Sequence, residues 1–214
     1  IYGFRYNTNQ IVRIGADGEI QLLNVTGLAG AYPAGDVSED GVLYLYGENK
    51  FVTINLNPEA ANYLVAQTKL NYTDKINDFA FNPIDKNIYA VTSDSNPTTL
   101  LKYNIISNTV TSLGTVTGLS SASYGTSFMD SQGNLFVGNN ATGNIYRIAN
   151  TQNIIAGTAI STTLFSSALN GLSPGDGARC ASADIAPIAN NDQACAMAGE
   201  NSTINVLNND IAGT

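Results

Sequence analysis

The chain has 214 residues, of which 43% are hydrophobic and only 12% are charged, so it is long enough to bury a sizeable core beneath an uncharged polar surface. Seventeen acidic residues against nine basic ones give a net charge of −8, which disfavours binding to nucleic acids and to anionic lipid surfaces. Histidine is absent, which removes Ser-His-Asp and Cys-His nucleophile pairs, His-ligated zinc and the commonest general base at neutral pH. Carboxylates, tyrosines and lysines still permit catalysis, so the composition lowers the expectation of an enzyme without excluding one.

A short phrase recurs along the chain, in which a polar turn leads into a Leu/Ile–aromatic pair. It occurs at 40–46, 85–91 and 130–137, and the chain opens on a fourth copy without its turn. The first apolar residues of the four pairs are spaced by 42, 45 and 47 residues: Ile1, Leu43, Ile88 and Leu135. A period of about 40–50 residues made of short strands is typical of β-propeller blades. The sequence therefore predicts an all-β fold, a β-propeller over residues 1–183 built of four-stranded antiparallel blades. A many-stranded β-sandwich is the alternative, but it does not require this near-constant step.

The predicted strands follow the repeat in chain order, with the recurring phrase as the second strand of each unit. In the first unit they lie at 1–4, 10–14 and 19–23, with a tight turn at Asp17-Gly18. In the second unit they lie at 35–37, 42–46, 51–54 and 63–66, with one helical turn around 58–62. In the last two they lie at 78–81, 88–92, 100–105, 109–113, 126–129, 135–137, 144–148 and 159–165.

The ends of the repeat predict how the propeller closes. The first unit lacks a first strand, and residues 174–180 occupy the place of a fifth first strand. The simplest closure pairs residues around 177–182 with the opening strands, which removes free sheet edges. Since four blades are few for a closed ring, we expect either further blades upstream or an unusually small ring.

The character of the sequence changes after residue 183, and residues 184–214 read as a linker and the start of a second module. Alternation at Ile204 and Val206, followed by Asn208-Asn209-Asp210, indicates a strand and a turn. The pattern Pro-x-Ala-x-x-Asp at 187–192, followed by Thr-Ile-Asn-Val-Leu-x-Asn-Asp at 203–210, resembles the opening of the cadherin-like or immunoglobulin-like β-sandwich modules that occur in tandem in large bacterial adhesins.

Residues 1–183 resemble the propeller-like repeat domain that precedes such modules in secreted bacterial proteins. The likeness is carried by the recurring Leu-Tyr strand, by Gly35-Asp36-Val37 and by the run from Asp176 to Cys180. It implies an extracellular, cell-surface protein in which the propeller is displayed on a stalk of further tandem Ig-like modules.

Cys180 and Cys195 are the only cysteines, and they flank the linker 15 positions apart. In an oxidising compartment a disulfide between them is the natural interpretation, with two unpaired buried thiols as the alternative. A loop of this size would contribute roughly 3 kcal/mol in the chain-entropy model and would fix the angle between the two modules.

Three aspartates stand at or near the starts of first strands, which line the centre of a propeller: Asp36, Asp78 and Asp176. One interpretation is a ring of carboxylates that holds a cation or a polar ligand. The other, which we favour, is that each carboxylate caps a turn or bonds a neighbouring backbone amide. The repeat phases also differ, because Asp36 aligns with Phe81 and Phe128, which weakens the ring.

The aromatic residues fall into two groups. Tyr44, Tyr89 and Phe136 belong to the repeated phrase and are expected to pack between blades. Tyr32 and Tyr124 precede first strands and are the candidates for stacking on a carbohydrate or a peptide, while Arg179 is a candidate partner of Asp176.

Asp192 and Asp210 lie at the junction between the modules. Adhesin modules of the resembled kind often hold Ca²⁺ at this place, and clustered Asp and Asn oxygens suit a hard cation. The resemblance therefore implies a calcium site at this junction, and calcium is the one candidate cofactor.

These features together favour a non-enzymatic ligand-binding or display module of a bacterial cell-surface adhesin, which binds a glycan or a protein. Nucleic-acid binding and direct membrane insertion are not expected. Two alternatives remain open: a propeller enzyme that acts on glycans as a lyase or hydrolase through Asp and Tyr, and a purely structural spacer of the stalk.

Overall fold

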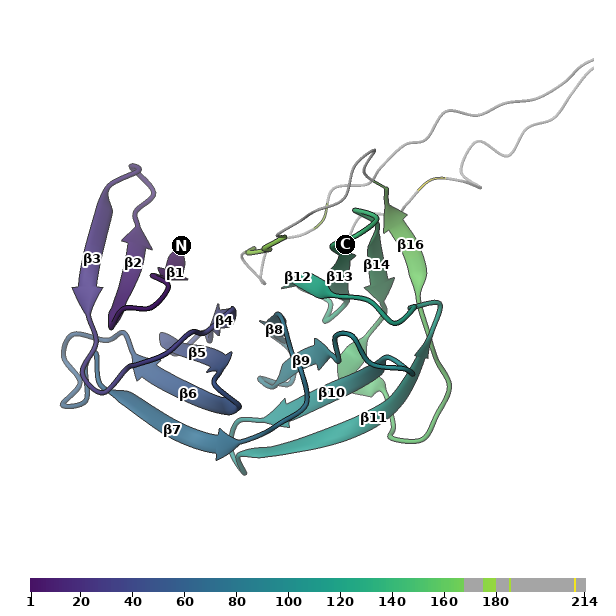
Figure 1. Cartoon of the computed structure of the whole chain (residues 1–214), viewed down its shortest axis with the longest axis horizontal. Coiled ribbons are helices and arrows are strands. Elements are labelled where there is room, and N and C mark those ends of the chain that lie inside the picture. The colour runs from purple at the N-terminus through teal and green to yellow at the C-terminus, as the bar shows by residue number, and fades with distance from the viewer. Residues whose placement is uncertain (168–174, 180–184, 186–209, 211–214) are drawn as a thin grey trace, which may run out of the picture.

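The computed structural model describes residues 1–167, 175–179, 185 and 210. Within them, sixteen short strands form four sheets that are arranged as the blades of a propeller (Figure 1), as the repeat predicts. The one helical element in these residues is the 3-10 turn η1 at Thr151–Asn153. No helix in the described residues is long and apolar enough to cross a membrane.

The first two blades are simple antiparallel sheets whose strands follow one another in the chain. The first blade holds three strands, β1 (Tyr2–Phe4), β2 (Gln10–Ile14) and β3 (Ile20–Asn24). The second blade holds four, β4 (Ala34–Val37), β5 (Val42–Gly47), β6 (Lys50–Asn55) and β7 (Ala66–Asn71).

The third blade has a fifth strand, which the chain contributes on its way through the fourth blade. The third blade contains β8 (Phe79–Phe81), β9 (Ile88–Val91), β10 (Thr99–Asn104) and β11 (Thr109–Thr117), and β15 (Ile160–Ser161) joins its edge in parallel to β11. The fourth blade contains β12 (Tyr124–Met129), β13 (Leu135–Asn139), β14 (Ile145–Ile148) and β16 (Thr163–Ser166). The chain thus leaves the fourth blade after β14, visits the third blade at β15 and returns as β16.

The recurring phrase occupies the same place in each sheet. Leu43 lies in β5, Ile88 begins β9 and Leu135 begins β13, and each of these is the second strand of its blade. The opening copy forms β1, which is the first strand present in a blade of three. The prediction that the first unit lacks its first strand is therefore confirmed.

Three local predictions were wrong. The fourth strand of the second blade is β7, whereas Tyr63 and Val65 form only isolated bridges, because Leu64 has a φ of 52° that interrupts a strand. Residues 58–62 form turns and no helix. The single strand expected at 159–165 is divided into β15 and β16, which belong to different blades.

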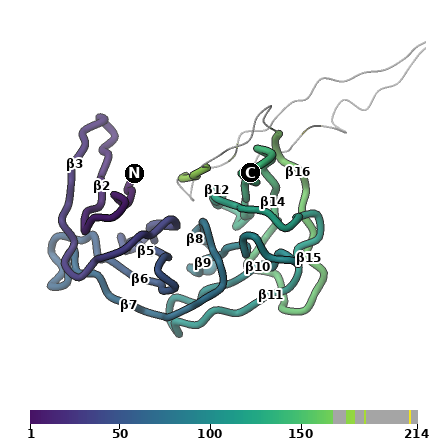
Figure 2. The backbone as a smooth tube through the Cα atoms, in the orientation of Figure 1, coloured from purple at the N-terminus to yellow at the C-terminus, as the bar shows by residue number. Residues whose placement is uncertain are grey.

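The blades form an open arc around their inner strands. The first strands β4, β8 and β12 lie side by side at the centre, and β1 contacts β4. Figures 1 and 2 both show the first and fourth blades separated at the open side of this arc. The predicted strand pairing around 177–182 is not found in its described part, because residues 175–179 adopt no strand. Their contacts with β12 are described below.

Three apolar clusters hold the arc together, one between each pair of neighbouring blades. The cluster between blades one and two contains Ile11, Leu45 and Ile54. The cluster between blades two and three contains Tyr44 and Phe51, and the cluster between blades three and four contains Leu135 and Val137. Tyr89 belongs to the last of these clusters, so Tyr44 and Tyr89 pack between blades as predicted.

Phe136 is buried differently from the other two aromatic residues of the phrase. Its ring stacks on Phe128 at 4.9 Å between centroids and meets the edge of Phe165 at 4.7 Å, and both partners belong to the fourth blade itself. Among the described residues, Phe136 thus packs within its own blade.

Candidate functional site

A cavity of about 490 Å³ opens where the inner strands meet at the open side of the arc. We call it the inner cavity. Its lining comes from three blades and from the segment 175–179: Ile1, Tyr2, Gly35, Asp36, Val37, Ser38, Glu39, Phe81, Pro83, Ala178 and Arg179. Apolar and aromatic walls with a few polar groups are typical of a small-molecule site.

Asp36 is the residue of this lining whose pKa is shifted most from its usual value. Its two oxygens accept backbone N–H bonds, one from Val37 at 2.8 Å and one from Phe81 at 2.7 Å. Burial raises the pKa of Asp36 to about 6, although these two hydrogen bonds oppose the shift by favouring the carboxylate. Because Phe81 belongs to the third blade, the carboxylate joins the inner strands of two blades.

Asp78 repeats this arrangement one blade further on. It is 2% exposed, and its oxygens accept the N–H groups of Phe79 and of Ser127, which lies on β12 of the fourth blade. Burial raises the pKa of Asp78 well above its usual value, and the nearby charges of Asp176 and Asp36 act in the same direction.

Asp176 makes the first of these two bonds, since its carboxylate accepts the N–H of the next residue, Gly177, at 2.8 Å. The three predicted carboxylates are therefore brought near one another. Asp36 and Asp78 each bond the next amide of their own strand, which is the kind of contact that the sequence favoured. Each also bonds an amide of the following blade, which the sequence did not suggest.

The segment 175–179 lies directly against β12. A β-carbon on Gly177 would be 2.5 Å from Cγ2 of Thr126 and 3.3 Å from the backbone nitrogen of Ser127, so only glycine permits this approach. Ala178 and Arg179 then reach the inner cavity together with Ile1 and Tyr2. The segment thus spans the distance from the fourth blade to the first without forming a strand.

Two hydroxyls beside this segment are unusual, because Oγ1 of Thr126 and Oγ of Ser127 are buried without a hydrogen-bond partner in the described residues. No group of three or more Asp, Glu or Cys side chains in the described part of the chain is arranged to hold a metal ion.

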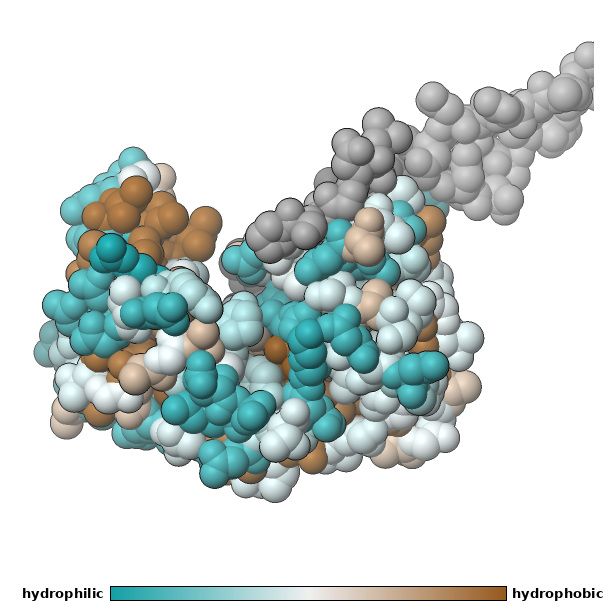
Figure 3. All heavy atoms as spheres, viewed as in Figure 1, coloured by the Kyte–Doolittle hydropathy of each residue, from teal (hydrophilic) through white to brown (hydrophobic). Residues whose placement is uncertain are grey.

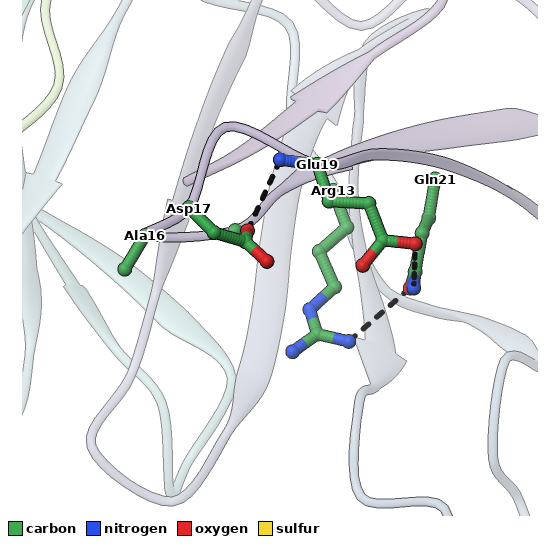
Figure 4. A pocket seen from close by; sticks show the side chains of 6 residues that line it. Arg13, Ala16, Asp17, Glu19 and Gln21 are labelled. Atoms are coloured by element: carbon green, nitrogen blue, oxygen red, sulfur yellow. Dashed lines mark hydrogen bonds between the residues drawn. The ribbon is translucent and has the colours of Figure 1, made fainter.

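A second hollow, of about 350 Å³, lies at the β2–β3 hairpin (Figure 4). Arg13 donates to Gln21 at 3.2 Å, and Gln21 donates to Glu19 at 3.2 Å. The backbone N–H of Glu19 bonds Asp17 at 3.1 Å, which closes the turn. All these side chains come from one exposed hairpin, without the apolar walls of the inner cavity, so this hollow is the weaker candidate.

The two tyrosines expected to stack on ligands are buried. Tyr32 is 5% exposed, meets the edge of Phe4 at 5.4 Å and donates its hydroxyl to the carbonyl of Ala29. Tyr124 is 1% exposed and donates to the carbonyl of Ser120. Both rings are part of the core, because Tyr32 packs in the cluster between the first two blades and Tyr124, the first residue of β12, packs in the cluster between the last two.

The remaining candidates divide between the cavity and the undescribed residues. Arg179 lines the inner cavity, and its pairing with Asp176 stays a prediction. Cys180, Cys195 and Asp192 lie outside the described residues, and Asp210 is described without its neighbours. The disulfide and the calcium site therefore also stay predictions.

Sequence reasoning missed the residues that form most of the cavity wall, notably Tyr2, Ser38, Phe81 and Pro83. They come from different blades, and no spacing in the chain links them. A partial signal existed, because Ser38, Phe81 and Pro83 all follow or end first strands, where the loops of neighbouring blades converge.

Comparisons with known proteins place this fold in a family. A family model described as "Repeat of unknown function (DUF6923)" matches residues 1–182, which include all four blades. The chain belongs to this repeat family. No curated protein matches this DUF6923 chain.

Several solved structures share the fold of the DUF6923 domain. A catalytically inactive virginiamycin B lyase from Staphylococcus aureus with quinupristin has a TM-score of 0.54 at 13% identity, over 86% of this chain and 57% of that one. The nidogen/laminin complex has a TM-score of 0.54 at 14% identity, over 78% of this chain and 61% of that one. At these identities the likeness shows the fold alone. The chain spans about half the length of the lyase chains that it matches, 49% of one and 57% of another.

Proposed function

We propose that this DUF6923 domain is a non-enzymatic ligand-binding module of a bacterial cell-surface protein, and that its inner cavity takes a terminal sugar unit of a glycan. The observation that carries the proposal is the cavity itself, about 490 Å³ in volume and assembled from three blades and the segment 175–179. The adhesin-like character of residues 186–214 supports display at a cell surface.

The lining suits an uncharged or amino sugar. Tyr2 is only partly buried and supplies aromatic surface against which the C–H face of a sugar ring can pack, and Glu39 and Arg179 supply polar groups in the lining. Glu39 already pairs with Lys86 at 2.6 Å, and the whole chain carries a net charge of −8. An anionic glycan is therefore the less favourable ligand.

A glycan array followed by calorimetric titration of the best ligand tests the proposal. Tyr2→Ala should weaken binding at least about fivefold, because a stacking contact of this kind contributes on the order of 1 kcal/mol or more. Tyr6→Ala is the matched control, since Tyr6 lies on the same blade, is 72% exposed and does not line the cavity. Equal loss in both variants, or no glycan bound at all, would reject the cavity as the site and leave the structural spacer.

A second candidate function has one specific observation in its favour. The pKa of Asp36 lies at about 6, within the range of a general acid or base, as a glycan lyase or hydrolase would need. Both oxygens of Asp36 are occupied by backbone N–H groups, however, which directs them away from a substrate. New chain ends released from a bound glycan, detected by mass spectrometry and lost in Asp36→Asn, would favour the enzyme over the binding module.

A further inference from the structure

The first blade has one apolar face that packs and one that does not. Tyr2, Phe4, Ile11 and Leu23 belong to the cluster shared with the second blade. The register of the three strands places the alternate residues on the opposite face, and there Val12 pairs with Leu22 and Ile14 pairs with Ile20.

This opposite face, which we call the open face (Ile1, Gly3, Val12, Ile14, Ile20 and Leu22), is exposed. The exposed fractions are 76% for Ile1, 38% for Ile14, 66% for Ile20 and 51% for Leu22. Figure 3 shows the corresponding brown surface over the first blade, directed toward the open side of the arc. On β2 and β3 the only other residues of this face are Gln10 and Asn24, so it carries no charge there.

The equivalent positions in the second blade show that this face packs against a neighbouring blade. Alignment of the strand pairs puts Ile1, Gly3, Val12 and Ile14 at the positions of Leu43, Leu45, Val52 and Ile54. Those four residues are at most 3% exposed, and they pack against the first blade.

The third and fourth blades repeat the rule. Ile88 and Ala90, at the same positions of β9, belong to the cluster shared with the second blade. Leu135 and Val137, at the same positions of β13, belong to the cluster shared with the third blade. In every blade after the first, this face covers the blade that precedes it in the chain.

We propose that the open face is an inter-blade interface, and that its occupant is a further antiparallel blade of the same polypeptide, N-terminal to β1. Consecutive blades are neighbours throughout the arc, so the blade beyond the first is the one that precedes it. The chain also covers only 57% and 61% of two structures whose fold it shares.

A second copy of the chain fits this face less well. Six residues are few against the roughly 20–30 residues that each partner contributes to a stable intermolecular interface. Two copies with a net charge of −8 each also repel. A tethered blade instead meets the face at a high effective concentration, and a small aliphatic patch then suffices.

The test compares the 214-residue chain with the polypeptide that its gene encodes, including the residues before Ile1. Ile14→Lys should lower the thermal midpoint of the encoded polypeptide by about 5–10 °C, because it places a charge in an interface, and should leave the 214-residue chain within about 1 °C. Ile106→Lys is the control in both proteins, since Ile106 is 89% exposed and lies away from this face.

Should Ile14→Lys prevent folding of the encoded polypeptide, hydroxyl-radical footprinting of the unsubstituted proteins gives the same answer. Labelling of Ile20 and Leu22 should fall at least about tenfold in the encoded polypeptide relative to the 214-residue chain. Equal labelling in both, or a gene that encodes no preceding blade, overturns the proposal. A concentration-dependent dimer of the encoded polypeptide that Leu22→Lys dissociates also overturns it and assigns the face to a second copy.

Discussion

Asp36 joins two blades through one carboxylate, and it does so at the cost of a desolvated charge. Its oxygens accept the N–H groups of Val37 on its own strand and of Phe81 on the next blade. The sequence shows an aspartate at the edge of a first strand, which suggests a turn cap or a ligand. It does not show that the second amide lies 45 residues further along the chain.

The stability of the domain should fall between pH 5 and pH 7. Burial raises the pKa of Asp36 from 3.8 to about 6 in the folded chain, so the folded state binds more protons than the unfolded state between these values. The free energy of unfolding therefore decreases as the pH rises, by about 1 kcal/mol from Asp36 alone over this window. Burial shifts the pKa of Asp78 in the same direction and adds to the effect.

Urea denaturation at both pH values measures this difference. Asp36→Asn should flatten the slope and lower stability by about 1–3 kcal/mol, because one of the two amides loses its acceptor. Glu59→Gln, at an exposed position, serves as the control. A free energy of unfolding that rises from pH 5 to pH 7 would contradict the assignment.

Phe51 should be among the most sensitive core positions. It is 1% exposed, and its ring stacks on Tyr103 with centroids 4.4 Å apart and planes inclined by 7°. Phe51→Ala removes this contact between the second and third blades and should cost about 3–5 kcal/mol in chemical denaturation. Ile106→Ala should cost less than about 0.5 kcal/mol, since its side chain is exposed. Similar losses in both variants would show that the stack contributes nothing beyond ordinary surface burial.

At the scale of elements, the repeat predicted the second strands well and the fourth strands poorly. Second strands are buried on both faces, so their apolar residues run continuously, as in the fully buried β9. The fourth strand β7 is polar and half-exposed, and the more apolar run 63–66 beside it resembled a strand more closely. The left-handed backbone at Leu64, which the sequence does not signal, decides between the two.

The candidate site was also predictable only in part, because its wall is formed by residues of different blades. Asp36 and Arg179 were identified by their positions near first strands, and both line the inner cavity. The apolar wall depends on how three blades pack together, and the residue pattern within one blade does not show which residues of the other blades lie beside it. Tyr32 and Tyr124 are buried, which the sequence did not indicate, because a single tyrosine at or just before a first strand carries no pattern that separates a core position from an exposed one.

Gly177→Ala should detach the segment 175–179 from β12 without unfolding the blades. The new β-carbon would meet Thr126 and the backbone of Ser127 within the distances at which atoms overlap, so the segment has to move. Hydrogen exchange at residues 125–128 should accelerate, and the thermal midpoint should change by no more than about 2 °C. Gly3→Ala is the control, because a β-carbon there meets nothing within 4 Å. Unchanged exchange at 125–128 would show that the segment does not protect β12.

At the scale of the whole molecule, each apolar cluster belongs to one interface between neighbouring blades, so stability is built from nearest-neighbour terms. The first blade has three strands and one covered face, whereas the third is covered on both faces. Hydrogen exchange measured by mass spectrometry should therefore be faster for β2 than for β9 by at least about tenfold. Equal protection of these two strands would mean that the arc opens as one cooperative unit.

The addition of β15 to the third blade has a mechanical consequence for the fourth blade. The chain passes from β14 to the edge of the third blade at β15, and then returns to the fourth blade as β16. Tension that enters along residues 149–166 is thus divided between two sheets, since pulling β16 away from β14 also loads the parallel bonds of β15 to β11. Under a pulling force applied through residue 166, these two blades would therefore yield together and not one strand at a time.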